Sequence, residues 1–200
     1  MEFEIDYLRN KKRRRRKQFL KKVLLWVGQI AVVILLAYFI VNIVLEKTTV
    51  PGDSMEPTLS TGDAILVNKF AYLFRDPKRN DVIVFKQSGS EHDYYDLKRI
   101  VGLPGETIQI IDGQVWINGE LMEEIIDCEI MLIPGLAKDR MTLEENEYFV
   151  LGDNRNNSED SRFANVGTIV QEDIIGKAWI RLNEFGFINT FNMKKTIESR

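Results

Sequence analysis

An uninterrupted apolar run near the amino end constrains this chain more than any other feature. Residues 23–45 contain no charged side chain, and sixteen of these 23 residues are Leu, Ile, Val or Phe. As an α-helix the run would be roughly 34 Å long, which is enough to cross a hydrocarbon core of about 30 Å. A buried helix of a soluble protein is rarely apolar on every face over this length. The run therefore predicts a transmembrane helix at 23–45.

The run does not fit a cleaved secretory signal. Such a signal has an apolar core of about 7–15 residues, followed by small residues in an Ala-x-Ala-like pattern. Here the run is longer, and residues 46–50 read Glu-Lys-Thr-Thr-Val. We therefore expect an uncleaved anchor that crosses the membrane once.

Charge is distributed unevenly along the chain. The net charge of the 200 residues is −3, but residues 1–22 carry ten Lys or Arg against three acidic residues. Positive charge beside a membrane span favours the cytoplasmic side, where it also meets anionic lipid. We expect a basic cytoplasmic tail at 1–22 and an acidic extracytoplasmic domain at 46–200. A lipid bilayer, rather than nucleic acid, is then the partner of the basic residues.

The scarcity of cysteine and histidine narrows the possible chemistry. Cys128 and His92 are the only residues of their kinds, which excludes an intramolecular disulfide and metal sites built on cysteine pairs or several histidines. The acidic and amide-rich stretch 153–160 does not fit an EF-hand calcium loop, because Arg155 takes its third position and Ala164 its twelfth. We expect no metal and no cofactor.

Beyond residue 45 the pattern changes to short apolar runs separated by turn residues. Asx-Gly pairs at 112–113 and 118–119 are typical of tight hairpins, and no stretch shows sustained helical periodicity. The runs expected to form strands are 64–67, 81–85, 107–111, 114–117 and 147–151. We predict a mostly β body, and we expect residues 186–200 to be a loosely held tail.

Ser54 lies in a turn bounded by Gly and Pro, where a hydroxyl can be presented. A serine hydroxyl is a weak nucleophile and needs a neighbouring base. One alternative is a triad with His92 and Asp93, although both lie in a strongly polar stretch. The other is Lys98, which lies in an apolar strand segment.

A lysine amine can act as a base only when it is neutral. Lysine has a reference pKa of about 10.4, and full burial can lower such a value by up to about 3–5 units. Side-chain alternation places Lys98 and Ile100 on one face of their strand, and the intervening residues on the other. One face could therefore desolvate the amine, but spacing alone still favours a solvated lysine.

Three segments resemble the signature motifs of bacterial type I signal peptidases of the Ser-Lys type. The first motif, Ser-Met-x-Pro-Thr-Leu, occupies 54–59, and the second, Lys-Arg-x-x-Gly-x-Pro-Gly-Glu, occupies 98–106. The third, Gly-Asp-Asn-x-x-x-Ser-x-Asp-Ser-Arg, occupies 152–162. With the stretch 62–69 the resemblance covers most of residues 46–176. The motifs stand in the family's order behind a matching anchor, which makes the set specific.

The resemblance implies a role for each matching residue. Ser54 corresponds to the nucleophile, Lys98 to the general base, and Ser158 to a residue whose hydroxyl orients the lysine. Asp160 and Arg162 match an ion pair that supports the site. Other matching residues form the turn into the third motif or shape the nucleophile turn: Gly152, Asp153, Asn154, Met55 and Pro57.

The resemblance also implies the fold and the substrates. The fold would be an antiparallel β-sheet body with an accessory β region at about 105–146. The substrates would be secretory preproteins with small residues at −1 and −3, bound as an added strand near Ser54. Gly52 departs from members that have Ser or Thr there. The oxyanion would then depend on backbone N–H groups, chiefly that of Ser54.

Two other functions remain open. A catalytically silent relative could act as a membrane-anchored binding module, although both Ser54 and Lys98 are retained. A self-cleaving Ser-Lys repressor of related fold would need DNA-binding helices where this chain has its anchor. We expect a membrane-bound serine endopeptidase that removes signal peptides at the outer face of the cytoplasmic membrane.

Overall fold

The computed structural model describes residues 2–87 and 95–188, with side chains from residue 15 onwards except those of residues 40 and 42. The chain divides into two units, an N-terminal helix and a β-rich body that begins at Leu45.

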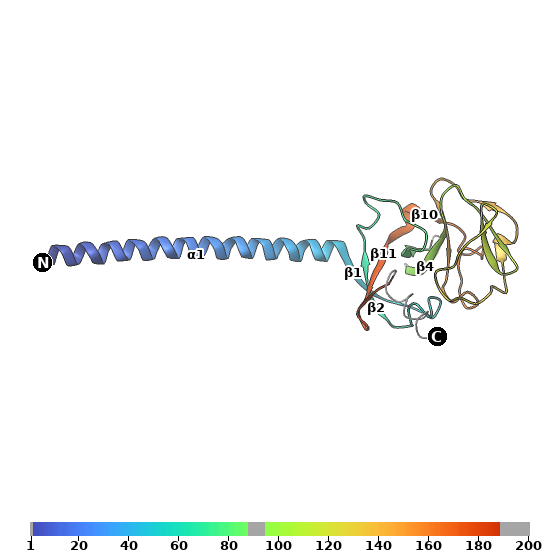
Figure 1. The fold of residues 1–200 in the computed structure, drawn as a ribbon, viewed down its shortest axis with the longest axis horizontal. Coiled ribbons are helices and arrows are strands. Elements are labelled where there is room, and N and C mark those ends of the chain that lie inside the picture. The colour runs from blue at the N-terminus through green and yellow to red at the C-terminus, as the bar shows by residue number, and fades with distance from the viewer. Residues whose placement is uncertain (1, 88–94, 189–200) are drawn as a thin grey trace. The chain divides into compact units, whose positions relative to one another are not determined.

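The N-terminal unit is one helix, α1 (Glu2–Val44), drawn in blue in Figure 1. It contains both the basic segment and nearly all of the apolar run. Its stretch Arg15–Phe39, with a hydropathy of 2.1, is long and apolar enough to cross a membrane. Large apolar side chains on this stretch are exposed, among them Leu24 at 76% and Leu35 at 66%. A helix that exposes apolar side chains all round is suited to lipid rather than to water.

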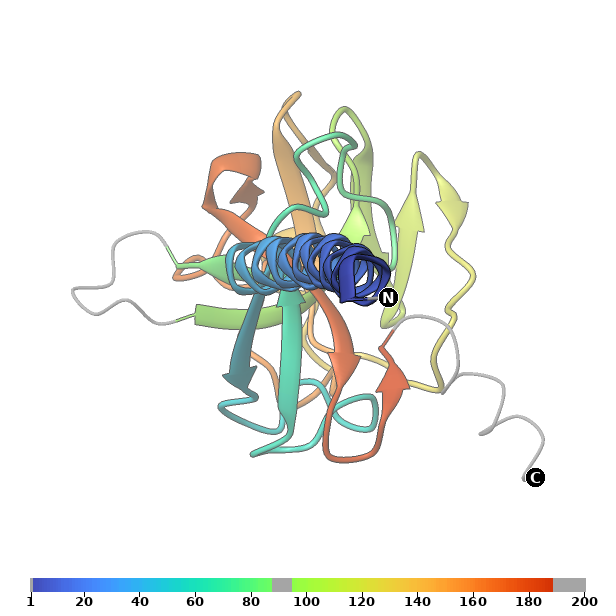
Figure 2. The same ribbon diagram turned by 90° about the vertical axis from the view of Figure 1, so that its left-hand side faces the viewer.

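The body is built on one antiparallel sheet (Figures 1 and 2). Its strands are, in spatial order, β1 (Leu45–Thr49), β2 (Ala64–Asn68), β11 (Ile174–Arg181), β3 (Val82–Lys86), β4 (Tyr95–Gly102), β9 (Glu147–Leu151) and β10 (Ile169–Val170), with β12 (Gly186–Phe187) beside β11. Every neighbouring pair is antiparallel. A 3₁₀ helix, η2 (Gln171–Asp173), joins β10 to β11. The predicted mostly β, antiparallel fold class is confirmed.

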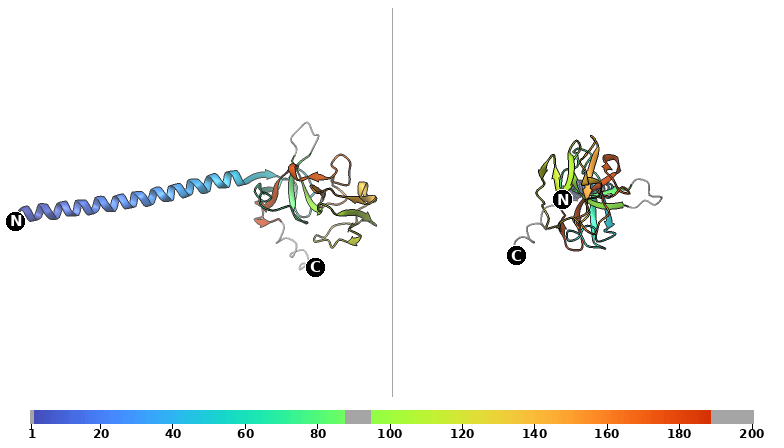
Figure 3. Two further views of the ribbon diagram at one scale, coloured as in Figure 1. Left: turned by 90° about the horizontal axis from the view of Figure 1, so that it is seen from above. Right: turned by 90° about the vertical axis from the view of Figure 1, so that its right-hand side faces the viewer.

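A second, smaller sheet lies within the region 105–146 (yellow-green in Figure 3). Its strands are, in spatial order, β7 (Glu120–Leu121), β6 (Gln114–Ile117), β5 (Thr107–Ile111) and β8 (Met141–Thr142), and η1 (Gly135–Lys138) precedes β8. The turn between β5 and β6 has positive φ at both Asp112 and Gly113. This is the backbone that a two-residue hairpin of the Asx-Gly kind requires.

Buried apolar clusters join these parts. One cluster packs Met55 and Leu59, from the segment that follows Ser54, against strand residues such as Ile65 and Leu97. A second cluster joins the two sheets, with Val101, Phe149 and Leu151 from the main sheet and Ile108, Ile110 and Val115 from the smaller one. The first of these clusters holds the segment around Ser54 against the main sheet.

The C-terminal part of the body differs from expectation. The prediction of a loose tail from residue 186 is wrong for its first three residues. Gly186 and Phe187 form β12, and the N–H of Ile188 donates to the carbonyl of Trp179 at 3.0 Å. Ile188 is 3% exposed, because its side chain joins the apolar cluster that contains Met55 and Leu59. Residues 189–200 lie outside the described part of the chain.

Candidate active site

Ser54 sits in a tight turn shortly after β1. Val50, four residues before it, and Met55, the next residue, are both buried in the same apolar cluster. The N–H of Glu56 donates to the carbonyl of Asp53 at 3.0 Å, and the peptide bond from Glu56 to Pro57 is cis. The turn is thus anchored by buried side chains, while Ser54 itself stays partly exposed.

Lys98 lies in the middle of β4, where it pairs in register with Ile83 of β3. Its side chain is buried, with 2% of the residue exposed. The solvated lysine favoured by spacing alone is therefore wrong. Lys98 Nζ donates a hydrogen bond to Ser54 Oγ at 3.2 Å. A nucleophile and a base at this separation can exchange a proton directly.

Asp96 also contacts the amine, which the sequence reasoning missed. Lys98 Nζ lies 2.6 Å from Asp96 Oδ1 and 2.7 Å from Asp96 Oδ2. Asp96 stands two residues before Lys98, and alternation along a strand puts such residues on one face. That spacing was the available signal, because it places a carboxylate within reach of the candidate base.

The third motif is tied directly to the nucleophile turn. The N–H of Asn154 donates to the carbonyl of Ser54 at 3.0 Å, and its side-chain amide donates to the carbonyl of Asp53 at 3.2 Å. The amide of Asn157 donates to the Asp53 carboxylate at 2.8 Å. These hydrogen bonds, together with the apolar cluster, fix the turn that carries Ser54.

Gly152 is packed between two serines. A Cβ atom at position 152 would lie 2.6 Å from the carbonyl oxygen of Ser54 and closer still to Ser158 Oγ. Ser158 is therefore a near neighbour of the nucleophile turn. Its hydroxyl is buried and has no hydrogen-bond partner among the described residues. The bond to the lysine that the resemblance implies for Ser158 is not present in this arrangement.

Asp160 and Arg162 form an ion pair, with both residues at most 2% exposed. Arg162 Nε and Nη2 donate to the two carboxylate oxygens at 2.8 and 2.9 Å. Asp160 Oδ2 also accepts from the N–H of Gly152 at 3.1 Å. The pair thus connects the end of the third motif to its beginning.

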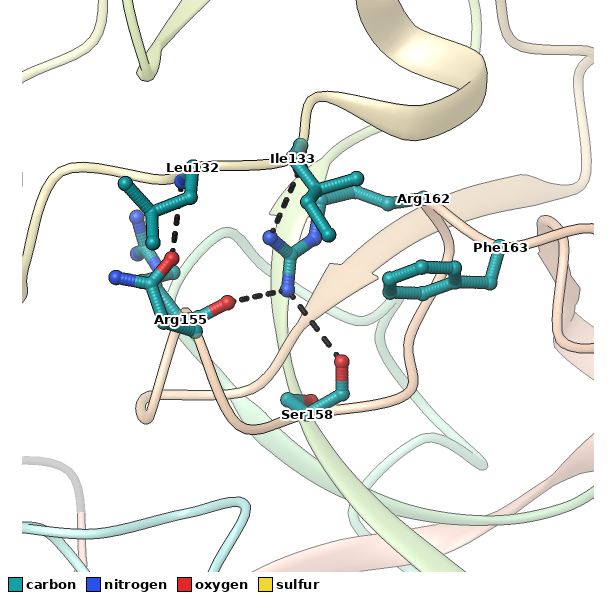
Figure 4. A pocket seen from close by; sticks show the side chains of 7 residues that line it. Leu132, Ile133, Arg155, Ser158, Arg162 and Phe163 are labelled. Carbon is teal, nitrogen blue, oxygen red and sulfur yellow. Dashed lines mark hydrogen bonds between the residues drawn. The ribbon is translucent and has the colours of Figure 1, made fainter.

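Arg162 also lines a small pocket (Figure 4). Its guanidinium donates to the carbonyls of Ile133, Arg155 and Ser158. The lining residues are Leu132, Ile133, Arg155, Asn156, Ser158, Arg162 and Phe163. Residues of the third motif and residues 132–133, which precede η1, therefore line the same pocket.

A second buried ion pair was not expected from the sequence. Arg99 Nε and Nη2 donate to Asp153 Oδ1 and Oδ2 at 2.7 and 2.6 Å, with side chains 1% and 0% exposed. Thr58 Oγ1 donates to the same carboxylate at 2.5 Å. The sequence signal was Arg99 itself, since a charged residue between Leu97 and Val101 on a buried face needs a buried partner.

The backbone N–H of Ser54 is free to donate. Among the described residues, nothing accepts a hydrogen bond from the N–H of Ser54. Gly52 has no left-handed φ, and a Cβ atom there would meet nothing within 4 Å. Gly52, two residues before Ser54, therefore faces open space. His92 and Asp93, the members of the alternative triad, lie outside the described residues.

Two perturbed groups lie near the third motif. Burial raises the pKa of the Cys128 thiol, so the thiol stays protonated near neutral pH. Burial acts to lower the pKa of Arg155, but its hydrogen bonds to Glu124 at 2.5 and 2.8 Å and the negative charges around it together leave the pKa raised. Within the described residues no group of three or more His, Cys, Asp and Glu could hold a metal ion. Neither perturbed group offers an alternative nucleophile.

Comparison with known proteins assigns this arrangement to a family. The family model for "Signal peptidase, peptidase S26" matches residues 23–183. The chain is 35% identical over 153 residues to "Probable signal peptidase I-2" of a Synechocystis species, covering 74% of this chain and 67% of that protein. It is 39% identical over 154 residues to signal peptidase I of Leptolyngbya laminosa, covering 74% and 73%.

A third relative extends the likeness over almost the whole chain. Signal peptidase I S of Bacillus subtilis is 32% identical over 184 residues, covering 88% of this chain and 95% of that protein. The matched region runs from the apolar helix to β11 and so contains all three motifs. The chain therefore belongs to the peptidase S26 family as a signal peptidase I, a serine endopeptidase.

Proposed function

We propose that this peptidase removes signal peptides from exported preproteins at the outer face of the cytoplasmic membrane, with Ser54 as nucleophile and Lys98 as general base. The observation that carries the assignment is the 3.2 Å separation of Lys98 Nζ and Ser54 Oγ. The burial of Lys98 supports it as well, because the amine is held against Ser54 inside the body rather than extended into solvent.

The reaction follows from this pair. The neutral amine accepts the Ser54 hydroxyl proton while Oγ attacks the scissile carbonyl. The resulting ammonium returns that proton to the leaving amine as the peptide bond breaks, which leaves an acyl-enzyme. A water molecule then attacks the ester and gives a proton to the amine. The ammonium passes that proton to Ser54 Oγ as the ester bond breaks, which releases the signal peptide and restores both Ser54 and the neutral amine.

Charge on the tetrahedral intermediate needs donors close to Ser54. The N–H of Ser54 is free for this purpose, which supports its use as an oxyanion donor. Gly52 supplies no hydroxyl, so the hole consists of backbone N–H groups. Removing one donor from such a hole typically costs about 2.7–4 kcal/mol in the transition state.

An open strand edge beside Lys98 supports binding of an extended peptide. The ladder between β4 and β9 begins at Arg99, while Tyr95–Lys98 pair with β3 alone. The other side of Tyr95–Lys98 therefore has no strand partner among the described residues. A preprotein segment can add there as a strand. The resemblance implies small residues at its −1 and −3 positions.

The third motif acts as the frame of the site. The Asp160–Arg162 pair fixes Gly152, the following Asp153 is held by Arg99, and Asn154 holds the Ser54 turn. Met55 and Pro57 shape the turn that carries Ser54, and the Ser158 hydroxyl lies close to Gly152. These residues support the dyad through position rather than through proton transfer.

The anchor sets the side of the membrane. The ten basic residues of 1–22 remain in the cytoplasm, so the body faces outside. Protease added to intact, wall-stripped cells should digest the body and spare the tail. Digestion confined to the tail would contradict this orientation.

One experiment tests the assignment directly. The detergent-solubilised full chain is incubated with a preprotein that carries an Ala-x-Ala cleavage site, beside the Ser54→Ala variant. We expect cleavage after the site by the wild type and none by the variant. A wild type that binds the preprotein without cleaving it would instead make the chain a binding module.

A further inference from the structure

The amine of Lys98 makes three polar contacts, and all three are to oxygen atoms. Two are to the carboxylate of Asp96, at 2.6 and 2.7 Å, and the third is to Ser54 Oγ at 3.2 Å. The described residues place no other carboxylate within 4 Å of this nitrogen. Asp96 is therefore the immediate ionic partner of the proposed base.

We infer that Asp96 is a positioning residue, which holds the amine of Lys98 so that its lone pair points at the Ser54 hydroxyl. The inference rests on the proposed Ser54–Lys98 dyad. A neutral amine has two N–H donors and one lone pair. One N–H, shared between the two oxygens of Asp96, holds the nitrogen from one side. Another tetrahedral position of the nitrogen can then direct the lone pair at Ser54 Oγ, and rotation about the last bond of the lysine side chain is restricted.

The same contact serves the state that follows proton transfer. Once Lys98 has taken the Ser54 proton, its ammonium has three N–H donors. Asp96 accepts one of them across its two oxygens, and the carboxylate charge stabilises the new cation. Asp96 thus acts on the lysine as the aspartate of a Ser-His-Asp triad acts on its histidine, by orientation and by charge.

Asp96 is itself held in place. Its Oδ1 atom also accepts a hydrogen bond from the N–H of Leu97 at 2.7 Å. Its side chain is 25% exposed, compared with 3% for Lys98. The carboxylate, at the start of β4, is therefore partly solvated while the amine that it contacts is buried.

Other charged groups around the site are engaged elsewhere. From the nucleophile turn, Asp53 accepts from Asn157. From the third motif, Asp153 and Asp160 are paired with arginines. On β3 the residue opposite Lys98 is the apolar Ile83. Glu91, His92 and Asp93 lie outside the described residues and are addressed by control variants.

Asp96 both places a negative charge beside the amine and orients it, and two substitutions separate these effects. Asp96→Asn keeps the size of the side chain, removes its charge and leaves only one oxygen to accept from the amine. Asp96→Glu keeps the charge but displaces the carboxylate.

The test is the pH dependence of kcat/KM for preprotein cleavage by the full chain in detergent. For Asp96→Asn we expect the half-maximal pH to fall by about one unit or more, because the ammonium has lost its counter-ion. We expect its plateau kcat to fall about 10–100-fold through misorientation, with KM little changed. For Asp96→Glu we expect a similar loss in kcat with a half-maximal pH close to that of the wild type.

Control variants distinguish a failure of this inference from a failure of the Ser54–Lys98 dyad and from a loss of folding. Glu91→Gln, His92→Ala and Asp93→Asn should each leave the half-maximal pH within a few tenths of a unit. An Asp96→Asn protein with wild-type unfolding and an unchanged pH profile would overturn the inference. If Asp96→Asn is unstable, an Asp96→Glu variant with unchanged kcat would overturn it instead. Cleavage by Lys98→Ala would refute the dyad, whatever the Asp96 variants do.

Discussion

The buried ion pair between Arg99 and Asp153 joins the strand that carries the proposed base to the turn that touches the nucleophile. Arg99 follows Lys98 in β4, and Asp153 precedes Asn154, whose N–H bonds to the Ser54 carbonyl. Thr58 of the first motif donates to the same carboxylate. All three motifs therefore meet at one buried charge pair.

Asp153→Asn should destabilise the body strongly. The change leaves the Arg99 guanidinium buried without its counter-ion, which typically costs about 3–5 kcal/mol. Urea unfolding of the full chain in detergent measures this loss. Glu46→Gln is the control, because its pair with Lys69 is exposed by about 40% on each side and should contribute at most about 1 kcal/mol. Equal effects of the two changes would contradict the proposed role of the buried pair.

Arg162→Ala should impair both stability and cleavage. It leaves Asp160 buried and unpaired, and it frees the turn from Gly152 to Ser158 that Asp160 and Arg162 brace. We expect a stability loss of about 3–5 kcal/mol and a reduced kcat even at temperatures where the variant is folded. Asp160→Asn should behave alike. Variants with full stability and full rate would show that the pair is dispensable.

Gly152→Ala should inactivate the enzyme through a steric effect. The added methyl group would overlap Ser158 Oγ and the Ser54 carbonyl, so the nucleophile turn must shift. A displacement of about 1 Å can cost about 100-fold in rate. Gly52→Ala is the matched control, because position 52 is open and has no left-handed φ. We expect near wild-type kcat for Gly52→Ala, and similar rates for the two variants would refute this account.

Gly52→Ser should raise kcat. The open space at position 52 accepts a hydroxymethyl group, and a hydroxyl two residues before Ser54 can add a donor to the oxyanion hole. A side-chain donor in such a hole is worth up to about 10²–10³ in kcat where its geometry is favourable. Steady-state kinetics beside Gly52→Ala distinguishes the hydroxyl from the extra carbon. If serine gives no more than alanine does, the hydroxyl does not reach the oxyanion.

Lys98→Arg should abolish cleavage although it keeps the charge. A guanidinium stays protonated throughout the usable pH range and cannot accept the Ser54 proton. In the wild type kcat/KM should rise with pH, because the neutral amine is the reactive form. His92→Ala should retain this profile. An active Lys98→Arg enzyme, or a folded but inactive His92→Ala enzyme, would favour the histidine triad over the dyad.

The sequence predicted the elements whose pattern is local. The five expected strands, at 64–67, 81–85, 107–111, 114–117 and 147–151, each coincide with an observed strand to within one residue at either end. The hairpin turns were predictable because Asp112 and Asn118, each followed by Gly, tolerate the positive φ that such turns need. Local composition alone specifies these features.

Elements that depend on distant contacts were not predicted. β11 lies in the middle of the main sheet, but Gly176, Lys177 and Ala178 weaken its strand pattern. Gly176 is there because a Cβ atom would lie 2.6 Å from the carbonyl of Asn68 on β2. That requirement comes from tertiary structure and leaves no periodic signal.

The same division holds for the site. The resemblance identified Ser54 and Lys98 as candidates, and the structure brings them together. Asp96 and the Arg99–Asp153 pair were missed, since their partners are defined by burial and by strand register rather than by a motif. A charged residue within a buried strand is the pattern that should have prompted a search for its counter-ion.

The absence of a linker between α1 and β1 limits how the enzyme meets its substrates. Leu45 follows the helix directly and already pairs with Asn68 of β2. Eight residues lie between it and Ser54, so even a fully extended chain would hold the two only about 30 Å apart. The Ser54 hydroxyl therefore stays within that distance of the residue that follows α1. With α1 as the proposed membrane anchor, a membrane-bound preprotein would reach Ser54 by diffusion in two dimensions, at an effective concentration set by geometry rather than by the bulk amount of either protein.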